Sequence, residues 1–182
     1  MKTESSAAYI ARLTITLLLI TAVVAAGLAC VNAVTAPEIE ALNAQKTQNA
    51  VEAVLPGGGE EIAFTDDSGI VSTIYKGQSG YAVEVTPAGF NGTVTMMVGV
   101  DTSGKVLGIS VVSHTETAGL GAEAAADNTA GNAFRSQFAG MSGSVSVSKD
   151  GGQVDALTGA TITSRAVCTG VNAALNAVAK LG

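Results

Sequence analysis

Seven residues near the C-terminal end have the types expected of a ligand-binding turn: Asp155-Ala-Leu-Thr-Gly-Ala-Thr161. We expect the Thr161 hydroxyl just ahead of a helix N-terminus, where unpaired backbone N–H groups and the helix dipole favour a phosphate. Gly159 and Ala160 add little bulk, so a large ligand could approach the backbone there. The alternative is an ordinary strand-to-helix turn, and a motif this short does not decide between the two.

A helix must follow this turn, and the sequence predicts it over residues 165–181. Apolar residues recur there at spacings of three and four, as in an amphipathic helix. They are Val167, Val171, Ala174, Leu175 and Val178. Thr163 or Ser164 is the expected N-cap, because both types accept hydrogen bonds from free backbone amides.

A second block, His114-Thr-Glu-Thr-Ala-Gly-Leu-Gly121, combines polar side chains with glycines. Its end, Gly119-Leu-Gly-Ala-Glu-Ala124, also fits the dinucleotide-binding pattern Gly-x-Gly-x-x-Ala. That reading requires strand–helix–strand units, whereas the preceding segment has the pattern of an antiparallel meander. The second block is therefore predicted to be a loop rather than a Rossmann turn.

The first motif, with Asp155, Thr158, Gly159, Ala160 and Thr161, resembles the flavinylation motif of a known domain family. That family is the FMN-binding domain of the G subunit of Rnf-type electron transport complexes. The C subunit of the sodium-pumping NADH:quinone reductase has a similar motif. The resemblance implies that a flavin transferase joins FMN, through its phosphate, to the hydroxyl of Thr161.

The second block is similar to the His-x-Glu-Thr-x-Gly-Leu-Gly segment of the same family, except that Ala118 replaces the usual proline. The resemblance extends from about residue 80 to the C-terminus. It implies that this loop lies against the flavin, with Thr117, Leu120 and Gly121 as candidate contacts. His114 and Glu116 either hydrogen-bond the cofactor or brace the loop.

The resemblance also implies a function. The chain would be a redox subunit without catalytic residues of its own, relaying electrons to other membrane subunits of a complex that couples ferredoxin:NAD oxidoreduction to sodium or proton transport. Arg165 either offsets the phosphate charge or is a solvated surface residue. The alternatives are a C-type subunit of the quinone reductase, an anchored FMN-binding sensory module, and a pilin-like surface protein.

Composition excludes several other classes. The formal net charge is −6, which argues against nucleic-acid binding. Cys30 lies in an apolar segment and Cys168 in the predicted last helix, so a disulfide framework is not expected. With one histidine and no Cys-x-x-Cys pattern, the chain has too few ligands for a zinc site or an iron–sulfur cluster.

Residues 13–34 contain no charged side chain, and at 1.5 Å per residue they would extend roughly 33 Å, enough to cross a bilayer. Lys2 and Arg12 precede this segment, and Glu38 and Glu40 follow it. The positive-inside rule therefore predicts a single-pass protein of the inner membrane, with its N-terminus in the cytoplasm and its C-terminal domain outside the cytoplasm. A cleaved signal peptide or lipoprotein signal ending near Cys30 is the alternative.

The rest of the chain predicts an α+β fold. Pro37 is the expected first residue of a juxtamembrane helix, which Pro56 and three glycines end. Strands are expected at 70–76, 81–86, 93–100 and 105–112, short helices at 122–126 and 132–138, and a final strand pair at 144–148 and 153–157. The expected organisation is a cytoplasmic N-terminus (1–12), a transmembrane anchor (13–36), a stalk (37–59) and an FMN-binding domain (60–182), with an antiparallel sheet and its helices on one side.

Overall fold

An apolar helix, α1 (Ser6–Val54), is the first element in the computed structural model, which describes residues 6–66 and 68–181. The chain divides into two compact units, one up to Ala44 and the other from Gln45 onward. In the first unit, α1 has an apolar stretch with a mean hydropathy of 2.4 and no buried residues, long enough to cross a membrane. Leu17 and Val23 are typical of its exposed side chains. This helix fits a single-pass membrane protein.

The helix does not restart at Pro37, contrary to the expectation from the sequence. α1 continues through this proline as far as Val54. A proline inside a helix removes one backbone hydrogen bond and bends the helix. The strong helix formers that follow, such as Glu40 and Leu42, favour continuation of the helix beyond that point.

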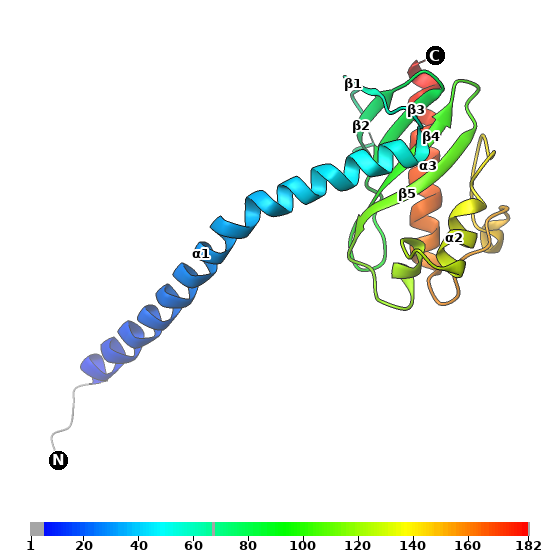
Figure 1. The fold of residues 1–182 in the computed structure, drawn as a ribbon. Helices are drawn as coiled ribbons and strands as arrows, with labels where there is room; N and C mark the ends of the chain where they lie inside the picture. The colour runs from blue at the N-terminus through cyan, green and yellow to red at the C-terminus, as the bar shows by residue number, and fades with distance from the viewer. Residues whose placement is uncertain (1–5, 67, 182) are drawn as a thin grey trace. The chain divides into compact units, whose positions relative to one another are not determined.

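Five antiparallel strands form the sheet of the second unit, in the order β1-β2-β3-β4-β5 (Figure 1). The strands are β1 (Glu60–Ile62), β2 (Val71–Lys76), β3 (Gly80–Val85), β4 (Val94–Asp101) and β5 (Val106–His114). The predicted meander is confirmed, and its four strands agree within two residues. β1 was missed because three residues are too few to show a period-two pattern. The antiparallel sheet also rules out the Rossmann reading of residues 119–124.

The two faces of the sheet are covered by different helices. The main core lies on the face against α3 (Thr161–Leu181), with Val83, Met96 and Val98 wholly buried. On the opposite face, Ala82 and Met97 pack against the end of α1. The segment predicted as a stalk therefore ends as a helix packed on the sheet, because the side chains of a strand alternate between two faces and both are apolar here.

Two short helices follow the sheet. They are the 3₁₀ helix η1 (Gly121–Ala124) and α2 (Thr129–Ser136), close to the predicted positions. Phe134 and Phe138 pack edge to face, with ring centroids 5.4 Å apart, and both are buried as predicted. α2 packs on β5 and η1, and η1 also contacts α3.

The predicted final strand pair does not form. Residues 144–148 and 153–157, all within the described part of the chain, are joined by a single bridge between Val147 and Val154 and enclose the 3₁₀ helix η2 (Ser148–Asp150). The Asn172 side chain of α3 donates to the carbonyl of Val145 and accepts from its N–H, both at 2.8 Å. These backbone groups are thus satisfied by a side chain rather than by a neighbouring strand.

Candidate functional site

A tight turn leads directly into α3. The Ala160 N–H donates to the Leu157 carbonyl at 3.0 Å, and Gly159 adopts a left-handed conformation with φ of 75°. The Ala160 carbonyl then accepts the first helical hydrogen bond, from the Ser164 N–H at 3.0 Å. Thr161 is therefore the first residue of the helix, and the backbone amides of the first turn point toward its N-terminal end.

The predicted N-caps, Thr163 and Ser164, lie inside the first turn of α3 instead. The Ser164 hydroxyl donates to the Ala160 carbonyl and accepts from the Leu157 N–H, each at 3.0 Å. Both contacts tie the helix to the preceding turn. The prediction was wrong because the glycine turn lets the helix start as early as Thr161, so the two hydroxyls brace the turn rather than cap the helix.

Lys149 contacts the hydroxyl of Thr161. Its ammonium group donates to Thr161 Oγ1 at 3.2 Å, and Thr161 is partly buried while Lys149 is exposed. Lys149 lies in η2, and the neighbouring Asp150 accepts two 2.6 Å hydrogen bonds from Arg165. The Arg165 guanidinium lowers the pKa of the Asp150 carboxyl. Lys149 was not among the site residues predicted from the sequence, since nothing in the chain order reveals that η2 folds back onto α3.

Glu116 joins three segments of the site. Its carboxylate accepts hydrogen bonds from the backbone of Phe90 (2.8 Å) and Asn91 (3.1 Å), and from the hydroxyl of Thr163. Glu116 is only 8% exposed. Burial by itself would raise the pKa of this carboxyl, but these hydrogen bonds and the nearby His114 outweigh burial and lower it. Glu116 thus braces the loop as an ionised group.

His114 supports the same loop from its base. Its ring Nδ1 accepts a hydrogen bond of 3.2 Å from the Glu116 N–H. His114 ends β5 and is partly exposed. Through these contacts His114 and Glu116 both brace the loop, which is one of the two roles left open by the sequence.

The two sequence blocks meet around a hollow of about 320 Å³. Seven of the ten residues singled out from the sequence line it: Glu116, Thr117, Leu120, Gly121, Gly159, Ala160 and Thr161. Four further lining residues were missed: Phe90, Lys149, Ile162 and Thr163. Phe90 is 66% exposed and Ile162 48% exposed. Of these four, Phe90 alone had a signal in the sequence, because it is an aromatic residue between the turn glycines Gly89 and Gly92.

Asp155 and Thr158 lie outside this hollow. They line a neighbouring one of about 610 Å³, next to α2, and Leu120 lies between the two. The Asp155 N–H donates to Gln137 Oε1 at 2.7 Å and the Gln137 amide donates to the Asp155 carbonyl at 3.2 Å. The Asp155 residue is exposed. These two motif residues are therefore exposed and lie outside the hollow beside Thr161.

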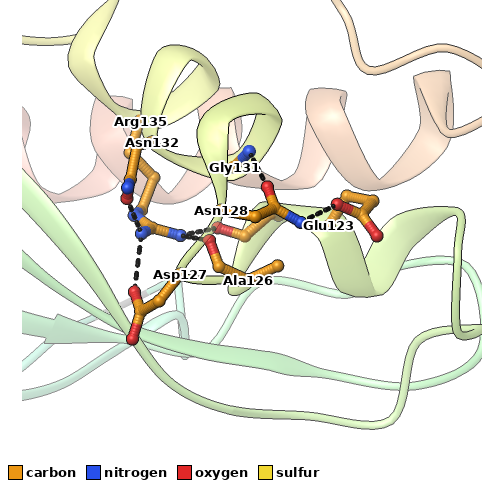
Figure 2. Close-up of polar contacts among 8 residues, drawn as sticks. Glu123, Ala126, Asp127, Asn128, Gly131, Asn132 and Arg135 are labelled. Carbon is orange, nitrogen blue, oxygen red and sulfur yellow. Dashed lines mark hydrogen bonds and ion pairs between the residues drawn. The ribbon is translucent and has the colours of Figure 1, made fainter.

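A clamp centred on Arg135 holds the segment that follows the loop from His114 to Gly121 (Figure 2). The Arg135 guanidinium reaches from α2 and donates to the carbonyls of Ala124 (2.9 Å) and Ala126 (3.0 Å). It also pairs with Asp127 at 3.0 Å. Asn128 caps α2 by accepting from the Gly131 N–H at 2.8 Å. This clamp keeps η1, and with it one wall of the hollow, in place.

Comparisons with known proteins agree with this geometry. Residues 89–176 match the FMN-binding domain family. The G subunit of the ion-translocating oxidoreductase complex of Methanosarcina acetivorans is 32% identical, in an alignment covering 93% of this chain and 94% of that protein. The G subunit of the Na(+)-translocating ferredoxin:NAD(+) oxidoreductase complex of Acetobacterium woodii is 34% identical, with 88% and 87% covered. The matched domain includes every lining residue of the hollow, from Phe90 to Thr163.

Proposed function

This chain belongs to the family of G subunits of ion-translocating oxidoreductase complexes, and we propose that it relays electrons through an FMN bound covalently at Thr161. Its relatives are named as subunits of ferredoxin:NAD(+) oxidoreductase complexes that translocate sodium or protons. The observation that carries the proposal is the position of the Thr161 hydroxyl, at the start of α3, beside a hollow and beside Lys149.

The residues around Thr161 fit the two chemically different parts of FMN. Phe90, Leu120 and Ile162 are exposed apolar side chains along the hollow, suited to the faces of an isoalloxazine ring. The amide end of α3 and the Lys149 ammonium suit a phosphate. A volume of about 320 Å³ is at the small end of ligand pockets, so part of the flavin would remain open to a redox partner.

The surroundings of Thr161 favour an attachment point over a catalytic nucleophile. A threonine nucleophile needs a neighbouring base to accept its proton. The side chain hydrogen-bonded to Thr161 Oγ1 is that of Lys149, and its ammonium group donates hydrogen bonds but cannot accept a proton. The carboxylate among the lining residues, that of Glu116, already accepts hydrogen bonds from Thr163 and two backbone amides. We therefore assign the attachment chemistry to a separate flavin transferase.

The proposed orientation explains why the flavin would be covalent. Lys2 and Arg12 precede the apolar stretch of α1 and Glu38 and Glu40 follow it, which favours an N-terminus in the cytoplasm and the FMN domain outside. A flavin held there by contacts alone would dissociate into a large volume. A phosphoester to Thr161 prevents that loss. We keep 13–36 as the anchor and 60–182 as the FMN domain, with the end of α1 between them.

The partners follow from this placement. Ferredoxin and NADH are cytoplasmic, so an extracytoplasmic flavin exchanges electrons with membrane-embedded subunits of the same complex. One spanning helix does not form an ion path by itself, so ion transport resides in those other subunits. FMN supplies one- and two-electron transfer when bound, and this chain supplies its position and its electrostatic surroundings.

A labelling experiment tests the assignment of Thr161. The full chain is co-expressed with a flavin transferase, denatured, and analysed by in-gel flavin fluorescence and intact mass. We expect a wild-type mass increase of FMN minus water and no label on Thr161→Ala. Thr169→Ala is the matched control, because Thr169 is an exposed threonine of the same helix away from the hollow. A colourless wild type in the presence of active transferase would refute covalent FMN at Thr161.

Deletion of the gene tests the relay. We expect loss of ferredoxin:NAD oxidoreductase activity coupled to ion transport in membranes, restored by wild type but not by Thr161→Ala. Normal activity after deletion would instead favour the sensory alternative.

A further inference from the structure

We infer that Lys149 is the group of this chain that orients the Thr161 hydroxyl and binds the flavin phosphate during attachment, and that the Asp150–Arg165 ion pair positions Lys149 for this role. The inference rests on the proposed function, since it concerns the same hydroxyl. Lys149 belongs to neither of the two sequence blocks, residues 155–161 and 114–121.

The first argument concerns the positive charge of Lys149. Within residues 6–66 and 68–181, ion pairs join Arg135 to Asp127 and Arg165 to Asp150, and none engages Lys149. The Lys149 ammonium instead donates to a neutral oxygen, Thr161 Oγ1, at 3.2 Å. A phosphate joined to that oxygen would bring negative charge directly to this cation and form a charge-assisted hydrogen bond with it.

The second argument is the rigidity of the segment that carries Lys149. Val147 and Val154 on either side of η2 are wholly buried. The Ser148 N–H donates to the Val154 carbonyl at 2.7 Å, and the Gly152 N–H donates to the Val147 carbonyl at 3.0 Å. The turn is thus fixed to the core at both ends, which holds the backbone of Lys149 in place beside Thr161.

The third argument concerns Arg165, which the sequence alone made a candidate for the phosphate. Both terminal oxygens of Asp150 accept from Arg165, at 2.6 Å each. These hydrogen bonds pair Arg165 with a carboxylate and tie η2 to the second turn of α3. Arg165 therefore holds the neighbour of Lys149 in place, while Lys149 itself contacts the acceptor oxygen.

The attachment step can be written so that it balances. The donor is a flavin pyrophosphate of the FAD class. A bond forms between Thr161 Oγ1 and the phosphorus next to the flavin, the pyrophosphate bond breaks, and a nucleoside monophosphate leaves. The hydroxyl proton passes to the transferase or to solvent. Lys149 keeps its protons throughout, and its charge offsets the negative charge that increases on the phosphoryl oxygens as the bond forms.

Labelling rates test this role. The purified full chain in detergent is incubated with transferase and FAD, and the labelled fraction is followed by fluorescence and intact mass. We expect Lys149→Met to slow labelling about tenfold, as for loss of one charge-assisted hydrogen bond, and Lys149→Arg to recover most of the rate. Lys180→Met, at the last turn of α3, is the matched control and should label at the wild-type rate.

Two further measurements separate a charge effect from a structural one. Added salt should slow labelling of the wild type more than of Lys149→Met, because a cation–phosphate attraction is screened by ions. Arg165→Met should slow labelling by a smaller factor, and should add nothing in the Lys149→Met background if it acts through Lys149. Thermal unfolding of each unlabelled variant shows whether the fold is retained.

The outcomes are distinct. Labelling of Lys149→Met at the wild-type rate would overturn the inference while leaving covalent FMN at Thr161 intact. Equal slowing by Lys149→Arg and Lys149→Met would also overturn it, because the positive charge would then be irrelevant. An unlabelled wild type would overturn the proposed function, and this inference with it.

Discussion

The Thr163 hydroxyl of α3 donates to the Glu116 carboxylate, which ties the helix that begins at Thr161 to the loop facing it across the hollow. The two residues are 47 positions apart in the sequence. Both are buried, at 1% and 8% exposure. The width of the hollow between the two sequence blocks therefore depends on this contact.

We expect Glu116→Gln to destabilise the fold by about 2 kcal/mol at pH 7, because hydrogen bonds to a charged acceptor are replaced by weaker ones. The folded-state pKa of Glu116 lies below its ordinary value of 4.5. Its stabilising effect is therefore fully present above that value and is lost as the pH falls through the folded-state pKa. The difference in unfolding free energy between wild type and variant should therefore become smaller as the pH falls. Urea unfolding at pH 7 and at lower pH values measures it.

Glu60→Gln is the control for that experiment, because Glu60 is exposed at the edge of the sheet. Its unfolding free energy should follow the wild type at each pH. A Glu116→Gln variant as stable as wild type at pH 7 would show that the carboxylate does not join the three segments.

Gly159 makes the turn before Thr161, and Gly159→Ala should both destabilise the fold and disturb the hollow. The left-handed backbone, with φ of 75°, costs an alanine about 1–2 kcal/mol. The added Cβ would also lie 2.9 Å from Leu120 Cδ2, a side chain that lines the hollow. We expect slower flavin labelling together with a lower melting temperature.

Gly104→Ala separates these two effects. Gly104 has nearly the same backbone angle, with φ of 78°, and open space around its Cα. It lies in the turn between β4 and β5, away from the hollow. The two variants should lose similar stability, and only Gly159→Ala should label more slowly. Equal labelling by both would show that Leu120 does not need to stay in place.

Arg135→Met tests the clamp on η1. Two carbonyl groups would lose a charged donor that is only 14% exposed, so we expect a loss of about 2–3 kcal/mol. Asp127→Asn removes only the ion pair, whose carboxylate side chain is 95% exposed, and should cost less than about 1 kcal/mol. Chemical unfolding gives both values. Labelling should slow for Arg135→Met alone, since η1 carries one wall of the hollow.

Gly99 allows the end of α1 to approach the sheet. A Cβ at Gly99 would collide with the Val54 backbone, whereas one at its strand neighbour Gly108 would meet open space. Gly99→Ala should therefore destabilise the second unit by about 1–3 kcal/mol. Gly108→Ala should change the stability by less than about 0.5 kcal/mol. Equal free energies of unfolding for the two variants, measured in urea, would contradict the packing of the end of α1 against the sheet at Gly99.

The local patterns of the sequence determined much of this molecule. The apolar run of α1, the Val, Ile, Thr and Tyr content of β2 to β5 with turn residues between them, and the helical spacing of α3 are each set by neighbouring residues, so they are readable without tertiary contacts. The motif ending at Thr161 and the loop from His114 to Gly121 were recognisable for the same reason. Seven of the residues named in them line one hollow.

Tertiary structure alone decided which groups meet around that hollow. Lys149 approaches Thr161 because η2 folds onto α3, and Glu116 bonds to Thr163 because a loop after β5 reaches the same helix end. The expected strand pair at 144–157 failed for a similar reason, since Asn172 from a distant helix satisfies Val145. Long-range hydrogen bonds and packing of this kind depend on chain segments far apart in sequence, and no local pattern of residues contains them.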